Sequence, residues 1–193
     1  MNVIRRLWTW LWRPSARLAV GILLIVGLVV GTGGIIVFNT VLTHTNTMEF
    51  CTGCHEMDIA LDELKKTKHY LNRVGVRAGC PDCHVPESGL PKYLAKLAAA
   101  KDVWGSLTGV INTPEKYEAM RLEMAKGVWE KMKATDSREC RSCHDFKAMK
   151  FDDQDKTAAK KHQRIMKTEG DERKTCIDCH RGIAHKLPSG VEE

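Results

Sequence analysis

The eight cysteines of this chain form four Cys-x-x-Cys pairs, and a histidine directly follows each pair. The motifs are Cys51–His55, Cys80–His84, Cys140–His144 and Cys176–His180, and no cysteine is left over. Cys-x-x-Cys-His is the attachment sequence of haem c, in which the thiols bond to the macrocycle and the histidine binds the iron. We therefore predict four covalent haems, attached through eight thiols: Cys51, Cys54, Cys80, Cys83, Cys140, Cys143, Cys176 and Cys179.

Two other uses of paired cysteines are open to such a sequence. Zinc accepts Cys and His in tetrahedral sites, but zinc sites do not require a histidine at the same offset four times. Disulfides between cysteines so close in sequence would close very short loops, which stabilise a fold little. Covalent haem is therefore the preferred interpretation.

Electron-transfer haems are usually held by two strong axial ligands. The motif histidines supply the first of these, and we expect His84, His144 and His180 to bind iron. Four other histidines remain, namely His44, His69, His162 and His185. The last three lie in the haem-bearing region and are candidate second ligands, whereas His44 lies close to an apolar segment and is expected at its interface.

The N-terminal part contains an uncharged apolar segment of 21 residues, from Leu18 to Phe38. This length is close to the roughly 20 residues that a helix needs to cross a bilayer. A cleaved signal peptide usually has a shorter apolar region and a small-residue cleavage site, and neither feature fits. We predict a cytoplasmic segment at 1–17, a transmembrane anchor at 18–38 and a periplasmic tetrahaem domain at 39–193.

The charge distribution gives the orientation of this anchor. Its four flanking arginines, Arg5, Arg6, Arg13 and Arg17, all precede the apolar segment, so the N-terminus is expected in the cytoplasm. Nearby Trp8, Trp10 and Trp12 are expected at the headgroup level. The rest of the chain contains 26 basic and 24 acidic residues. A domain so balanced gives no sign of nucleic-acid binding.

Helical patterns occupy much of the region after the anchor. Residues 91–104 are rich in Ala, Leu and Lys and are followed by Gly105 as a stop; residues 114–134 follow Thr113 as a cap; a weaker helix covers 156–168. We see no alternating strand pattern. The predicted fold is mainly α: a single transmembrane helix plus a small α-helical multihaem domain with little or no sheet. With fewer than about 40 residues per haem, the haems must supply most of the core.

Together these features resemble the NapC/NirT family of membrane-anchored tetrahaem quinol dehydrogenases, which includes NrfH- and CymA-like members. The likeness rests on the four motifs, the single N-terminal span and the stretch 136–144, and it covers nearly the whole chain. The first motif extends to Cys51-x-x-Cys54-His55-x-Met57, a pattern in which the family can use the methionine as iron ligand. The resemblance thus implies Met57 rather than His55 at the first haem, with His69, His162 and His185 as distal ligands.

The same resemblance implies a quinol site beside the first haem. Family members hold quinol with a lysine and keep an acidic residue near the iron, and Lys96 and Asp102 match those positions. A carboxylate there is chemically reasonable, because quinol oxidation releases protons as well as electrons. The alternative is that Lys92, Lys96 and Lys101 form only a solvated stripe.

The function implied is transfer of electrons from menaquinol or ubiquinol to a periplasmic reductase, with nitrate reductase as the expected partner. The expected location is the bacterial inner membrane, with the C-terminal domain in the periplasm. A terminal reductase with an open catalytic haem is the alternative; a haem-based sensor would need a larger cytoplasmic domain. The choice of quinone, the acceptor and any homo-oligomer stay open.

Overall fold

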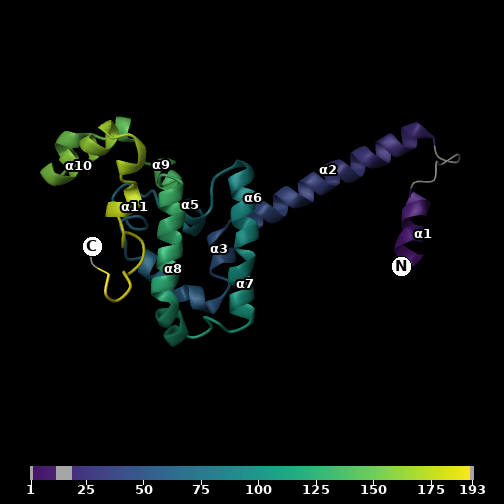
Figure 1. The fold of residues 1–193 in the computed structure, drawn as a ribbon, viewed down its shortest axis with the longest axis horizontal. Helices are drawn as coiled ribbons and strands as arrows, with labels where there is room; N and C mark the ends of the chain where they lie inside the picture. Colours follow the sequence, from purple (N-terminus) through teal and green to yellow (C-terminus); the bar gives the residue numbers. More distant parts are fainter. Residues whose placement is uncertain (1, 12–18, 192–193) are drawn as a thin grey trace. The chain divides into compact units, whose positions relative to one another are not determined.

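A computed structural model describes residues 2–11 and 19–191 (Figure 1). The chain divides into two compact units, residues 1–44 and 45–193.

The first unit consists of two helices, α1 (Asn2–Leu11) and α2 (Val20–His44). Helix α2 is 25 residues long, has a mean hydropathy of 2.7 in its most apolar window and buries none of that window within the protein. It is therefore long and apolar enough to cross a membrane. It continues six residues beyond the predicted end at Phe38, because Asn39 and Thr40 direct their polar side chains to the backbone carbonyls of Ile35 and Ile36. Of the predicted interfacial tryptophans, Trp8 and Trp10 lie on α1, and Trp12 lies outside the described residues, as does Leu18.

The second unit is built from short helices around one longer helix, α8 (Pro114–Ala134). No strand occurs in the described parts of the chain, which confirms the mainly α fold. The helices around α8 are α3 (Met48–Cys51), η1 (His55–Met57), α4 (Asp58–Leu64), α5 (Cys80–His84), α6 (Gly89–Ala98), α7 (Ala100–Leu107), α9 (Arg138–Arg141), η2 (Phe146–Ala148), η3 (Phe151–Asp153), α10 (Lys156–Lys167), η4 (Gly170–Glu172) and α11 (Cys176–Cys179).

Two of the three predicted helices are confirmed, and the third is divided. Thr113 caps α8, accepting a hydrogen bond from the Lys116 amide, and α10 lies where the weaker helix was expected. The single helix predicted at 91–104 is wrong, because the chain forms α6 and α7 with a break at Ala99. The Ala99 carbonyl accepts from the amide three residues ahead, at Asp102, which is the tighter turn of a 3₁₀ helix. Gly105 does not end the second helix, since glycine inside a helix costs only about 1 kcal/mol.

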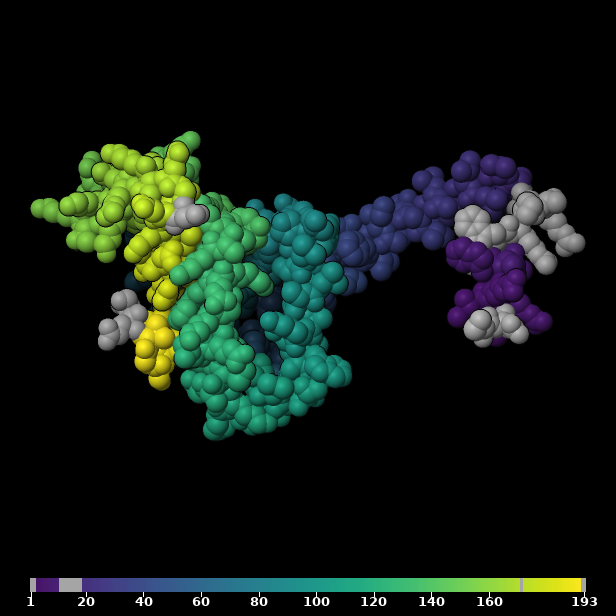
Figure 2. All heavy atoms as spheres, viewed as in Figure 1, coloured from purple at the N-terminus to yellow at the C-terminus, as the bar shows by residue number. Residues whose placement is uncertain are grey.

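Very few apolar side chains are buried in this unit. Only Leu64, Tyr117 and Ile177 are buried hydrophobic residues among those described. A protein core of this size would not stabilise about 150 residues, which agrees with a domain whose interior is completed by large prosthetic groups. Figure 2 shows the surface hollowed between α7 and α8, with the segment that carries α3 and α4, in dark blue, at its bottom.

Candidate haem and quinol site

The four Cys-x-x-Cys-His motifs lie next to one another in chain order. The Cys80 thiol hydrogen-bonds Cys51, which lowers the pKa of Cys51 to about 7. Helix α5, with the second motif, packs against α9, which begins the third. The Cys140 thiol hydrogen-bonds Cys176, which lowers the pKa of Cys176 to about 6. The second and third motifs are thus neighbours. The first motif also lies beside the second, and the third lies beside the fourth.

Three histidine pairs are the clearest feature of the site. The ring centres of His69 and His144 lie 6.2 Å apart. Those of His84 and His185 also lie 6.2 Å apart, and those of His162 and His180 lie 5.9 Å apart. A metal–nitrogen bond is about 2 Å long, so two imidazoles on opposite sides of one metal have centres about 6 Å apart. Each pair joins one motif histidine to one of the spare histidines, with the spacing that one iron requires.

A hydrogen bond orients His162, and a longer ionic contact lies beside His185. The Nδ1 atom of His162 lies 2.7 Å from Oε1 of Gln154, and Nδ1 of His185 lies 3.8 Å from Oε2 of Glu63. Metal-bound histidines characteristically present their second ring nitrogen to such oxygens, which fixes the ring and its tautomer. In His162 this leaves Nε2 as the atom for a metal.

The surroundings also favour the neutral imidazole, which is the form that binds metals. Burial lowers the pKa of His185, with the nearby carboxylate of Glu63 opposing this effect. Burial likewise lowers the pKa of His180, helped by the neighbouring His162 and His144 rings.

An ion cluster centred on the buried Arg121 lies next to His185. Arg121 is only 6% exposed and donates two hydrogen bonds to Glu63, at 2.8 and 3.0 Å, and two to Glu118, at 2.6 and 2.8 Å. Glu63 also accepts from the Lys186 amide at 3.0 Å, and the Lys186 carbonyl accepts from Arg121 at 3.1 Å. The cluster therefore joins α4, α8 and the C-terminal segment that carries His185. Nothing in the sequence pattern singled out these residues.

The first motif differs from the other three. The His55 side chain is 73% exposed, and its Nε2 lies 3.8 Å from Glu56. Met57 is half-buried on η1. Glu56, between them, is only 4% exposed and hydrogen-bonds Ser106 of α7, which lowers the pKa of the Glu56 carboxyl group. The first motif and α7 are therefore held together.

Lys96 and Asp102 lie on the adjacent helices α6 and α7. The Lys96 ammonium donates a hydrogen bond to the carbonyl of Thr45, and its charge is close enough to lower the pKa of Cys51. Burial lowers the pKa of Lys96 itself. Asp102 is exposed, and it precedes Ser106 by four residues, which places both on one face of α7. Both residues thus lie on elements attached to the first motif.

A strained corner joins the third and fourth motifs. Asp136 and Ser137 have φ angles of 51° and 49°, a region that residues other than glycine rarely adopt. Ser137 is fully buried, and its hydroxyl accepts from the Ile177 amide at 3.2 Å, while Asp136 pairs with Arg141 and Arg173 at 3.1 Å each. The corner falls within the stretch 136–144 that carried the family resemblance, but its role is visible only in three dimensions.

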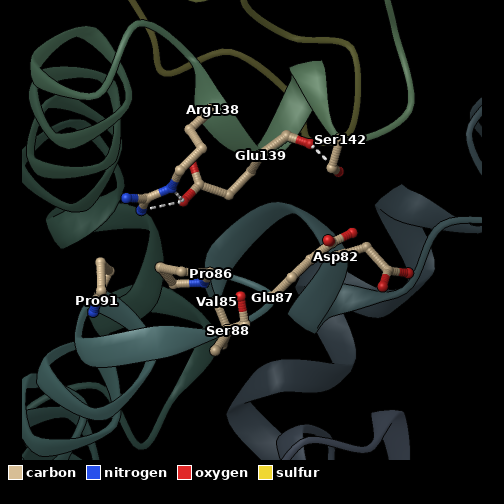
Figure 3. A pocket seen from close by; sticks show the side chains of 9 residues that line it. All are labelled: Asp82, Val85, Pro86, Glu87, Ser88, Pro91, Arg138, Glu139 and Ser142. Carbon is tan, nitrogen blue, oxygen red and sulfur yellow. Dashed lines mark hydrogen bonds and ion pairs between the residues drawn. The ribbon is translucent and has the colours of Figure 1, made fainter.

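A pocket beside the second and third motifs contains none of the predicted site residues (Figure 3). Its lining includes Asp82, Glu87 and the Arg138–Glu139 ion pair, whose closest atoms are 2.6 Å apart. The lining also includes Val85, Pro86 and Pro91, but none of the paired histidines, so we assign this pocket no part in holding a haem.

The donor arrangement fits haem c and not zinc. Among the described residues, no group of three or more Cys, His, Asp or Glu side chains converges as a tetrahedral zinc site requires. The histidines instead form opposed pairs, and each pair includes the histidine of an attachment motif. This is the arrangement that covalent haem with two axial ligands needs.

The comparison with known proteins agrees with this chemistry. Residues 13–190 match the family described as "NapC/NirT cytochrome c family, N-terminal region". The chain is 50% identical to the cytochrome c-type protein NapC of Escherichia coli K12, over 97% of this chain and 92% of that protein. It is 49% identical to the denitrification system component NirT of Stutzerimonas stutzeri, over 94% and 89%.

A third relative, a putative tetraheme cytochrome-c type protein of Allochromatium vinosum, is 46% identical over 77% of this chain and 79% of its own. No solved structure matches the chain. The family match covers nearly the whole sequence and includes all four motifs, so the chain belongs to the NapC/NirT cytochrome c family.

Proposed function

We propose that this cytochrome takes electrons from quinol at the outer face of the inner membrane and delivers them to a periplasmic reductase. The observation that carries the proposal is the hydrogen bond from Lys96 to Thr45. Thr45 directly follows the apolar helix α2, and Lys96 also lies near Cys51 of the first motif. A donor side chain suited to a quinol oxygen thus lies both where the chain leaves the membrane span and beside the first haem-attachment site.

The residues that would hold the haems follow from the geometry of the histidine pairs. We assign His144 with His69, His84 with His185, and His180 with His162 as axial pairs, and Met57 as the ligand of the first haem. The exposure of His55 and the partial burial of Met57 support the last assignment. Bound at the four motifs, haem c would supply a row of one-electron iron couples between the quinol site and the far end of the domain.

Lys96 would hold the quinol, and Asp102 would receive a proton. An ammonium group has three N–H donors, so Lys96 can keep its bond to Thr45 and still donate to a quinol oxygen. Asp102 is exposed, so a proton that it accepts can pass to water. A carboxylate beside the developing positive charge also favours deprotonation of the quinol.

The relatives give the expected acceptor and orientation. Relatives named NapC and NirT support nitrate or denitrification systems as the destination of the electrons. The arginines before α2 support a cytoplasmic N-terminus and a periplasmic second unit. We therefore propose a periplasmic nitrate reductase as acceptor and menaquinol or ubiquinol as donor.

Purified protein in liposomes tests the proposal. Menaquinol or ubiquinol in the bilayer should reduce the haems, and a purified periplasmic nitrate reductase with nitrate should then reoxidise them. Reoxidation by nitrate in the absence of the reductase would point instead to a terminal reductase. Failure of both quinols to reduce a protein that dithionite reduces would contradict the proposal.

A further inference from the structure

Helices α6 and α7 carry a row of exposed apolar side chains. It consists of Leu90, Leu94, Leu97, Trp104 and Leu107, whose exposed fractions are 66%, 55%, 73%, 68% and 77%. We call this set the apolar row. On α6 the members follow one another at intervals of four and three residues, and on α7 at an interval of three, which is helical periodicity for one face of each helix. Exposed apolar surface of this extent usually marks a site of interaction.

The apolar row does not face the rest of the domain. Each helical residue is turned by about 100° from the previous one. Lys96, two residues after Leu94, points to Thr45, and Ser106, two residues after Trp104, binds Glu56. Leu94 and Trp104 therefore lie about 160° away from these inward-facing side chains. In Figure 2 the two helices, in teal, form the edge of the second unit on the side away from α10.

Helix α6 is attached to Thr45, and this attachment indicates which kind of surface contacts the apolar row. Thr45 is the residue after the end of α2, a helix with the length and hydropathy of a membrane span. A helix fixed to that residue must lie near the bilayer surface if α2 spans the bilayer. Lys101, three residues before Trp104 and on the same side of α7, would then reach the lipid headgroups, which suits an amphipathic helix lying in the interface.

We propose that the apolar row of α6 and α7 is embedded in the outer leaflet of the membrane, as a second attachment of the domain in addition to α2. The occupant of this surface is lipid, and not a second copy of the chain. The proposal does not depend on quinol oxidation, although it would let a quinol reach Lys96 without entering water.

Site-specific photo-crosslinking in the full-length holoprotein tests this inference. All eight native cysteines lie in haem-attachment motifs, so an introduced cysteine would be the one free thiol. Leu97→Cys is labelled with a benzophenone maleimide, reconstituted into liposomes of phosphatidylethanolamine and phosphatidylglycerol, and illuminated. Lys160→Cys, exposed on α10, is the matched control. Intact-mass spectrometry then identifies what each label has captured.

The inference predicts that lipid adducts dominate at position 97 and are absent at position 160. A crosslinked dimer at position 97 would show that a second copy covers the row, and an adduct within the same chain would show that the domain covers it. An unreacted or water-quenched label at position 97 would show that the row faces solvent. Each of these three results would overturn the proposal, and none depends on whether quinol reduces the protein.

Discussion

Arg121 holds Glu63 through two parallel hydrogen bonds, although 58 residues separate them in the chain. The same carboxylate lies 3.8 Å from His185 and accepts from the amide of Lys186. One buried ion pair therefore fixes a candidate iron ligand that comes from the C-terminal segment. Bidentate guanidinium–carboxylate pairs of this kind give orientation as well as energy.

Replacing Arg121 by methionine should destabilise the domain strongly. The change leaves Glu63 without its buried partner, and breaking a buried ion pair typically costs about 3–5 kcal/mol. The free energy of unfolding, from a guanidinium titration followed by haem absorbance, measures the effect. Lys65→Met is the control, because the Lys65–Asp62 pair is exposed and long at 3.7 Å, and a loss within about 0.5 kcal/mol is expected there. Equal losses in both variants would show that the cluster is not structural.

Removing one spare histidine should change one haem and leave the other three. In His162→Leu the haem of the fourth motif loses its proposed second nitrogen ligand, and electron paramagnetic resonance should show one low-spin signal replaced by a high-spin signal. Gln154→Leu should keep the haem low-spin and shift its g-values, because Gln154 only orients the ring. Four unchanged low-spin signals in His162→Leu would show that His162 is not a ligand.

The two candidate ligands of the first haem can be separated directly. We expect one haem of the oxidised protein to differ from three bis-histidine haems. Met57→Leu should alter the signal of that haem, whereas His55→Leu should leave it nearly unchanged, since His55 is mostly exposed. The opposite outcome would assign His55 as the ligand.

Ser137 should contribute to stability through its buried hydroxyl. Ser137→Ala leaves the Ile177 amide without its acceptor in a buried position, which costs about 1–3 kcal/mol. Ser142→Ala is the matched control, because that hydroxyl is exposed and donates only to near neighbours in the chain, the Glu139 carbonyl and the Cys143 sulfur. A guanidinium titration of both variants should show a clear loss only for Ser137→Ala.

The sequence was informative where function depends on local spacing. The haem motifs, the apolar helix and helix α8 all rest on short-range patterns. Helix α8 has its predicted bounds, and α2 overlaps the predicted apolar segment but ends six residues later. The pairing of histidines could not be predicted in this way, because His69 meets a motif that begins 71 residues later and His185 returns to the second motif.

The residues that hold the site in place could not be predicted from the sequence either. Glu63, Arg121 and Ser137 look like ordinary surface residues in the sequence, and only the packed chain shows that they are buried or paired across long separations. The break at Ala99 was missed because alanine is the strongest helix former, so no local signal marks it. Lys96 of α6 bonds to Thr45, and Ser106 of α7 bonds to Glu56. Each helix is thus held in place by a different contact outside the two helices.

The most direct test of quinol oxidation at Lys96 is stopped-flow haem reduction in proteoliposomes, by quinol and by dithionite, in Lys96→Met and Lys92→Met. Lys92 lies on the same helix and bonds only to the carbonyl of Glu87, so its loss controls for a change of charge there. Losing a charged hydrogen bond to the substrate should slow quinol-driven reduction about ten- to a hundredfold in Lys96→Met. Reduction by dithionite, haem content and the Lys92→Met rates should stay near wild type. If quinol reduces Lys96→Met as fast as the wild-type protein, Lys96 does not hold the quinol and the site lies elsewhere.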